Sequence, residues 1–277
     1  MPVILAALML CLLLRAEAAM SAAAAACRLF VTAVLPGLFP YMTLSLMLTS
    51  RLSSRMSPAL LTLLGWGGGS PTGARLLGLC PGMTYRQRVR LAVSCATMSP
   101  MFLLGTIGGW LQSAAAGMIV MGSVLLGGLG AGLLAGCFVR ERATCPAYAP
   151  ADFQPPLSFG EAVEAAARTM LLVCGTMVML RVFAELAAQA VPSAALPLVT
   201  LLEVTAGAQQ IAGLPLPLPL RTALIAGATG FGGMAVLLQN RAVYAKSFLP
   251  LCLQVLWQGV HGALSFVFAL GTMLLFC

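Results

Sequence analysis

The sequence predicts an all-α polytopic membrane protein with about seven transmembrane helices, two re-entrant hairpins, and inverted repeats that contain broken helices. Three observations predict this class. Hydrophobic residues make up 60% of the 277 residues and charged residues only 8%, whereas soluble domains are roughly 45–50% apolar. Apolar stretches close to the roughly 20 residues that cross a bilayer recur along the chain. Two of them are interrupted by clusters of small, polar and helix-breaking residues, at 67–73 and 227–233.

These interruptions indicate where a substrate site should lie. A broken helix leaves backbone N–H and C=O groups unpaired, and because lipid cannot satisfy them, they must line a cavity or be buried in protein. Interrupted segments at corresponding positions of two halves are typical of the central site of a transporter. We therefore expect an N-terminal membrane helix and connection at 1–28, a first half at 29–139, a cytoplasmic connection at 140–168 and a second, inverted half at 169–277.

The chain opens with two expected spans. Residues 2–14 are apolar and predict a short first span, tilted or shallow in the bilayer. The small residues that follow resemble a signal cleavage site without its positively charged n-region, so the removal of residues 1–18 stays open. The second span is expected at 29–49, where Pro36 and Pro40 remove backbone donors and should kink the helix.

The rest of the first half is expected to be a hairpin and two spans. Residues 59–79 carry the first interruption near their middle, which predicts a hairpin that dips into the membrane and returns. Residues 91–110 predict a span interrupted at 97–100, and residues 118–139 predict an unbroken span whose glycines allow close helix packing. The longest polar connection follows at 140–160.

The second half opens with a helix start signal. Ser158 and Glu161 have the spacing of a capping box and predict a helix that runs through about residue 190. Within it, Arg181 and Glu185 lie four residues apart on one face, which predicts a mutual ion pair. The remaining expected elements are a proline-rich hairpin at 194–220, a span at 221–240 that carries the second interruption, and a final span at 249–276.

The distribution of basic residues predicts the orientation. If both hairpins return to the side they entered, basic residues gather on one side of the membrane, as the positive-inside rule expects of a cytoplasmic face. The N-terminus then lies inside and the C-terminus outside, and the two hairpins enter from opposite sides. The cytoplasmic set is Arg51, Arg55, Arg75, Arg86, Arg88, Arg90, Arg140, Arg142, Arg168, Arg241 and Lys246, against Arg15, Arg28 and Arg221 on the other side.

The composition argues against several other classes of function. The net charge of +8 is spread over short loops without a basic, aromatic-rich face, so no nucleic-acid partner is expected. The nine cysteines form no Cys-x-x-Cys or Cys/His cluster, and His261, the single histidine, is expected to pack rather than to bind a metal. No metalloprotease or hydrolase motif and no paired carboxylates occur within one segment. We expect neither an enzyme nor a cofactor.

Glu203 is the leading candidate for function. It is the only carboxylate deep in an apolar hairpin, where a charge costs several kcal/mol unless it meets a cation, a proton or water. The alternative is that Glu203 caps free backbone donors at the hairpin tip, and Thr205 could share either task. A membrane scaffold without transport would need packed helices but no such carboxylate.

The other breaks are expected to face the same central volume. The first hairpin tip around Ser70 and Thr72, the break that contains Ser99, and the break at 230–233 should all expose backbone groups toward it. Helix N-termini there would favour an anion, and C-terminal carbonyls a cation. Gln239 lies about two turns past the last break, either facing the cavity or at the membrane boundary.

At these motifs the chain resembles the sporulation integral membrane proteins of the YlbJ and SpoVV type, which carry the nucleoside-recognition Gate domain. The order of the hairpins and broken helices is also similar to the core of concentrative nucleoside transporters, which have a Leu-Thr-Glu in the second hairpin and a Gly-Phe-Ala-Asn in the next span. The matching stretches occur in the family order: 38–41, 69–75, 99–102, 201–205 and 230–233 with Gln239.

The resemblance implies a substrate site and a function. It implies substrate-binding roles for Ser70, Thr72, Ser99, Glu203, Thr205 and Gly232. It further implies export of dipicolinic acid, a small anionic aromatic metabolite, from the mother cell across the outer forespore membrane. The chain departs from the family at the tip residue Ser70, where a tyrosine is usual, and at Ala96 and Thr97, where asparagines are usual. It also lacks the first-hairpin glutamate of nucleoside transporters, which argues against a nucleoside.

The expected protein is therefore a multi-pass transporter in a bacterial cell membrane or the outer forespore membrane. Its partners are the lipid bilayer and a small anionic substrate, with a coupling cation or proton and homo-oligomerisation left open. The alternatives are a nucleoside-type or ion transporter of the same superfamily, and a sporulation membrane scaffold that does not transport.

Overall fold

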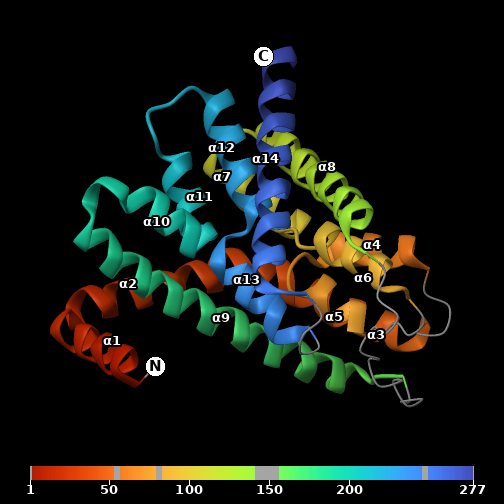
Figure 1. Cartoon of the computed structure of the whole chain (residues 1–277), viewed down its shortest axis with the longest axis horizontal. Helices are drawn as coiled ribbons and strands as arrows, with labels where there is room; N and C mark the ends of the chain where they lie inside the picture. Colours follow the sequence, from red (N-terminus) through yellow and green to blue (C-terminus); the bar gives the residue numbers. More distant parts are fainter. Residues whose placement is uncertain (1, 53–56, 79–82, 141–155, 245–248, 277) are drawn as a thin grey trace.

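The computed structural model describes residues 2–52, 57–78, 83–140, 156–244 and 249–276, and every element within these ranges is a helix (Figure 1). The expectation of an all-α protein is confirmed for these ranges. The first half contains α1 (Pro2–Leu14), α2 (Ala16–Leu29), the π-helical turn η1 (Phe30–Val34), α3 (Leu35–Leu52), α4 (Pro58–Gly68), α5 (Thr72–Gly78), α6 (Tyr85–Ser94), the π-helical turn η3 (Phe102–Ile107), α7 (Gly108–Trp110) and α8 (Ala114–Phe138). The second contains α9 (Phe159–Ala190), the short 3₁₀ turn η4 (Pro192–Ala194), α10 (Ala195–Leu202), α11 (Val204–Ala212), α12 (Leu218–Phe231), α13 (Gly233–Val243) and α14 (Leu251–Phe276).

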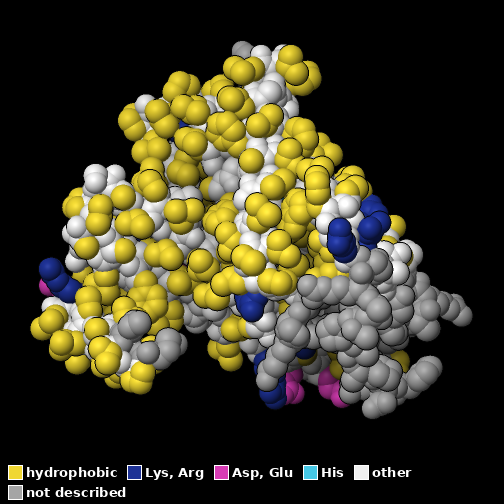
Figure 2. All heavy atoms as spheres, in the orientation of Figure 1, with side chains coloured by type: hydrophobic (Ala, Val, Ile, Leu, Met, Phe, Trp, Pro, Cys, Tyr) yellow, Lys and Arg dark blue, Asp and Glu magenta, His cyan; other side chains and the backbone are white. Residues whose placement is uncertain are grey.

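Five helical stretches among the described residues are long and apolar enough to cross a membrane, which supports the expectation of a helical membrane protein. Figure 2 shows that apolar side chains cover most of the visible face, while charged side chains occupy small groups near its edges. Helix α1, expected to span, has 13 residues, or about 20 Å, which is shorter than the bilayer core. The five stretches are Ala16–Leu52, Ala114–Phe138, Phe159–Ala190, Leu218–Val243 and Leu251–Phe276.

Two helices extend beyond their expected boundaries. The second span is part of a helix that is continuous from Ala16 to Leu52, and the π-helical turn at Phe30–Val34 comes directly before Pro36. Proline lacks the N–H that would bond four residues back, and a π turn is one way in which a helix accommodates such a local change. The expected divisions at 28/29 and 168/169 both fall inside continuous helices. Residues 141–155, which make up most of the expected connection at 140–168, lie outside the described residues. The same is true of the basic residues Arg55, Arg142 and Lys246.

The order of elements repeats along the chain. A long helix, a helix pair broken at its tip, a broken helix and another long helix occur first as α2–α3, α4–α5, α6–α7 and α8, and again as α9, α10–α11, α12–α13 and α14. Corresponding long helices pack together, since α2 and α3 contact α9 and α8 contacts α14, which it crosses at an angle (Figure 1). The two copies therefore share one interior rather than forming separate units.

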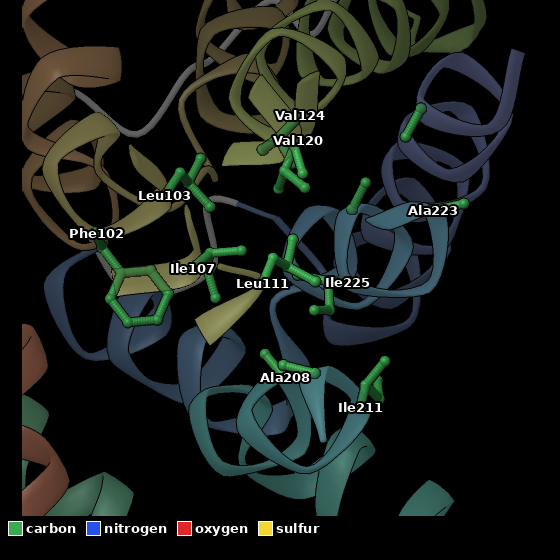
Figure 3. Packing of buried hydrophobic residues seen from close by; sticks show 14 of the residues in the cluster. Phe102, Leu103, Ile107, Leu111, Val120, Val124, Ala208, Ile211, Ala223 and Ile225 are labelled. Atoms are coloured by element: carbon green, nitrogen blue, oxygen red, sulfur yellow. The ribbon is translucent and has the colours of Figure 1, made fainter. Parts of the chain in front are cut away.

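The largest apolar core lies between the broken helices and α8. In Figure 3 the side chains of Leu103 and Ile107 from η3, Val120 from α8, Ile211 from α11 and Ile225 from α12 point toward one another. A second core joins α3 to α9, through Leu38, Met42 and Met170 among others. The first core contains residues of the broken segments η3, α11 and α12, and the second contains residues of η1, α3 and α9.

The predicted capping box at the start of α9 is confirmed. Ser158 Oγ accepts a hydrogen bond from the Glu161 N–H at 3.3 Å, and Glu161 Oε2 accepts one from the Ser158 N–H at 2.8 Å. These bonds satisfy donors that a helix start leaves free. The cap explains how α9 begins in a polar stretch ahead of its apolar part.

Ser158→Ala is expected to lower the free energy of unfolding by about 1 kcal/mol, because it removes the cap from α9. The measurement is the thermal unfolding midpoint of the purified protein in detergent, which should fall. Ser193→Ala is the control, since Ser193 is also exposed but lies in the short turn η4, which has no side-chain cap. An equal midpoint for wild type and Ser158→Ala would show that the cap does not contribute.

Candidate functional site

The helices break at all four expected places. The first break, at 69–71, separates α4 from α5, and the second, at 95–99, separates α6 from the helix that begins at Pro100. The third is Glu203, between α10 and α11, and the fourth is Gly232, between α12 and α13. Local clusters of glycine, proline and polar residues therefore located the breaks correctly.

The first and second breaks contact each other directly. The backbone N–H of Ser70 donates to the carbonyl of Thr97 at 2.7 Å, and the Ser70 hydroxyl donates to Asn240 Oδ1 on α13, also at 2.7 Å. Gly69, with φ of +63°, lies so close to the backbone of Ser99 that a Cβ would overlap it. Ser70 thus joins both breaks of the first half to a helix of the second half.

The third and fourth breaks also contact each other. Gly233 has φ of +70°, and a Cβ on it would lie 3.2 Å from the Leu201 carbonyl oxygen and 3.3 Å from the Val204 nitrogen. The positive φ, together with these short separations, favours glycine at this position. The four breaks therefore form two contacting pairs.

Glu203 lies at the centre of the third break, with only 1% of its surface exposed. Its Oε1 accepts from the N–H of Thr205 at 3.0 Å and its Oε2 from the N–H of Ala206 at 2.8 Å, so the carboxylate caps the first turn of α11. These hydrogen bonds confirm that Glu203 caps the backbone donors at the hairpin tip. A carboxylate that caps a helix can also take part in transport. None of the ion pairs among the described residues involves Glu203.

The first three breaks, together with α13, which follows the fourth, line one small cavity of about 40 Å³. Its polar wall contains Ser70, Ser99, Glu203, Thr205 and Gln239, which are five of the seven candidate residues. Its apolar wall comes from η1, α3 and α9, with further apolar residues from the second break, η3, α11 and α13. A volume of this size holds on the order of two or three waters, so the cavity has to widen before it can hold an aromatic metabolite. The apolar lining residues include Val34, Leu38, Val173 and Met177.

The other two candidates, Thr72 and Gly232, do not line this cavity. Thr72 is fully buried, and its hydroxyl donates to the Gly68 carbonyl across the first break at a long 3.4 Å. Gly232 has φ of +79° and lets α12 turn into α13. Both residues stabilise the backbone conformation of a break, and neither contributes a polar group to the cavity lining in this conformation.

Gln239 lies in the interior and lines the cavity, as the first of its two predicted placements has it. It is 3% exposed, and its Nε2 donates to the Thr176 hydroxyl of α9 at 2.8 Å. Thr176 and Asn240 are site residues that the sequence reasoning missed. The adjacent polar residues 239 and 240 were the available signal, but Arg241 beside them favoured a boundary position.

The other predicted polar residues are placed as follows. His261 of α14 is fully buried, and its Nε2 lies 2.8 Å from the Val124 carbonyl oxygen of α8, which makes it a packing residue at that interface. Arg181 and Glu185 form the predicted ion pair, with Nη2 and Oε2 at 3.5 Å. The described residues contain no cluster of three or more His, Cys, Asp or Glu side chains.

No protein-family model, no curated protein and no solved structure matches the chain.

Proposed function

We propose that the protein is a multi-pass membrane transporter of a small anionic metabolite that works by alternating access between its two halves. The observation that carries this proposal is the cavity at which four broken segments meet around the buried carboxylate of Glu203. Helix breaks at membrane depth are tolerated where they are buried in protein or line a cavity, and transporters use them to bind substrates.

The proposal includes the full membrane topology expected from the sequence. The seven spans would be α1, α2–α3, α6–α7, α8, α9, α12–α13 and α14, and the two hairpins would be α4–α5 and α10–α11. The repeated order of elements and the packing of corresponding long helices support this drawing. An inverted pair of halves provides two equivalent conformations, open to opposite sides, around a fixed site.

Charge balance at the site favours coupled transport. A buried carboxylate repels an anionic substrate unless a proton or a cation neutralises it. Glu203 has two backbone N–H donors but no ion-pair partner among the described residues. We infer that a proton or a monovalent cation enters with the substrate and offsets this charge.

The proposed substrate is dipicolinic acid, moved from the mother cell across the outer forespore membrane. The sporulation-family resemblance suggests this compound, and the lining of the cavity is compatible with it. An aromatic ring suits the apolar side formed by residues such as Leu38, Phe102 and Met177. The Ser99 hydroxyl, whose oxygen accepts from the Phe102 N–H, has a proton to donate to a carboxylate. A nucleoside-type or ion transporter is the second candidate, because the broken helices alone suit these classes equally.

The test combines a spore assay with reconstitution. Deletion of the gene in a spore-forming host should leave dipicolinic acid synthesis intact but greatly lower its content in spores, and the wild-type gene should restore the content. Purified protein in liposomes should also take up labelled dipicolinate. Normal spore content, or no uptake by correctly inserted protein, would contradict the substrate assignment. A spore defect without uptake would indicate the scaffold instead.

A further inference from the structure

A second hollow, of about 610 Å³, lies along the same two long helices as the central cavity. On α9, Val173 and Met177 line the central cavity, and Arg181, Glu185 and Gln189 line the second hollow. Successive positions in this series are four residues apart, so each neighbouring pair lies on the same side of α9, while the series as a whole winds gradually around the helix. The facing helix shows the same progression, with residues 18–25 at the second hollow and Val34 and Leu38 at the central cavity. We call the second hollow the vestibule.

A thin apolar cluster lies beside Glu203 on the α2 side. Leu29 and Leu202 pack against Ala184, Val199 and Ala206. Ala206 is the residue whose N–H binds the Glu203 carboxylate, and Leu29 lies on the first long helix between the residues that line the vestibule and those that line the cavity. In this conformation the two hollows are therefore separate, with apolar side chains between them.

Arg181 lies on α9 one turn before Ala184 of this barrier, and it carries unused hydrogen-bond donors. Its side chain is 15% exposed, and its pair with Glu185 uses only Nη2 at 3.5 Å. Its Nε and Nη1 are buried and have no hydrogen-bond partner among the described residues. Arg181 is also close enough to Glu203 to interact with it electrostatically. Buried donors without acceptors are costly and call for water or an anion.

Arg15 supplies a second guanidinium to the vestibule. It lies between α1 and α2 and lines the same hollow as Arg181. Glu17 and Glu185 line it too, so the vestibule is close to neutral when empty, and its two guanidinium groups come from opposite walls. Arginine binds carboxylates through paired N–H donors, which gives such a site a preference for planar anions.

We propose that the vestibule is a recognition site for small organic carboxylates on the exit path from the central cavity, on the side of the membrane where Arg15 is expected, and that Arg181 holds the carboxylate next to the barrier. The inference rests on the proposed transport function and deepens it, because it assigns a second substrate site and a residue that selects for carboxylate. Arg181 exchanges its loose contact with Glu185 for the bidentate contact with the substrate. The substrate reaches this contact from the central cavity, which Ser70 and Ser99 line, when the barrier opens.

Arg181→Gln is expected to weaken the equilibrium binding of labelled dipicolinate to the full-length protein in detergent by about tenfold or more, since it removes a charge-assisted contact. Arg181→Lys, which keeps the charge without the planar fork, should give an intermediate loss. The matched control is Arg168→Gln, because Arg168 lies on the same helix and pairs with Glu164 at the same spacing, but on the surface. Control and wild type should bind equally.

Glu185→Gln keeps the test decisive if the Arg181 variants fold poorly. It frees Arg181 from its present partner, so dipicolinate binding should become tighter, by about two- to fivefold. Unchanged or weaker binding in Glu185→Gln, or wild-type binding in a folded Arg181→Gln, would overturn the inference while leaving transport standing.

Binding measurements with two simpler carboxylates test the vestibule independently of the proposal that dipicolinic acid is the substrate. Phthalate and benzoate are used as probes beside dipicolinate. Arg181-dependent binding of either probe by a protein that does not move dipicolinate would support the vestibule and overturn the dipicolinate proposal. Failure of wild-type protein to bind any of the three would overturn the vestibule.

Discussion

Glu203→Gln is expected to lower dipicolinate uptake into proteoliposomes to about one hundredth of the wild-type rate or less, while the protein remains folded and inserted. The two carboxylate oxygens each accept one backbone N–H, from Thr205 and Ala206. Glutamine keeps one acceptor, but it turns an NH₂ group toward the other donor and cannot take up a proton or pair with a cation. The loss of one charge-assisted contact, worth roughly 2–3 kcal/mol, corresponds to this decrease in rate.

The same substitution weakens the cap of α11, so folding must be measured beside transport. We expect the thermal midpoint of Glu203→Gln to fall, because one backbone donor is left buried and unpaired, at a cost of about 1–3 kcal/mol. Glu164→Gln is the matched control: Glu164 is a surface carboxylate on α9, paired with Arg168, and its loss should leave uptake unchanged. Wild-type uptake by Glu203→Gln would reduce the role of Glu203 to capping.

A third variant distinguishes charge from capping. Glu203→Asp retains the ionisable group on a shorter side chain, which weakens the cap but keeps the site able to bind a proton or cation. If coupling depends on the charge, this variant should retain more uptake than Glu203→Gln at equal folded fraction. Equal loss in both variants would mean that the geometry of the break, rather than its charge, is required.

The breaks and the buried acid could be predicted from the sequence because their signals are local. Glycine, proline and small polar residues interrupt apolar runs at 67–73 and 227–233 whatever surrounds them, and a lone carboxylate such as Glu203 stands out in an apolar hairpin. Their convergence on one cavity is a property of the tertiary structure. This convergence depends on close contacts between particular glycines and the backbone of another break. The sequence has 29 glycines and does not show which of them make such contacts.

The extent of the long helices was harder to predict. Residues 16–28 are rich in alanine, and their modest hydropathy predicts a connection. Alanine has the highest helix propensity, however, and the helix continues through them. The polar start of α9 is helical because its cap and the Glu164–Arg168 pair stabilise it. The apolar wall residues of the cavity, such as Val34 and Met177, could not be recognised, since in sequence they look the same as residues that face lipid.

Gly69→Ala is expected to have the largest effect on the folded state. Gly69 has φ of +63°, which disfavours a side chain. A Cβ there would also lie 2.8 Å from the Met98 carbonyl carbon and closer still to the Ser99 nitrogen, both of them backbone atoms that cannot rotate away. Strain and overlap together should cost about 3 kcal/mol or more. The first break should then move off the second, so that the hydrogen bond from Ser70 N–H to the Thr97 carbonyl is lost.

The expected result for Gly69→Ala is a clear fall in the thermal midpoint in detergent and little or no uptake by the fraction that stays folded. Gly109→Ala is the matched control, because Gly109 lies in the helical segment α7 and a Cβ there would meet no atom within 4 Å. It should be neutral or slightly stabilising, by up to about 1 kcal/mol. If Gly69→Ala had the same thermal midpoint and uptake as Gly109→Ala, the contact between the first two breaks would not be needed. The proposed substrate site would then consist of Glu203 and other residues of the second half alone.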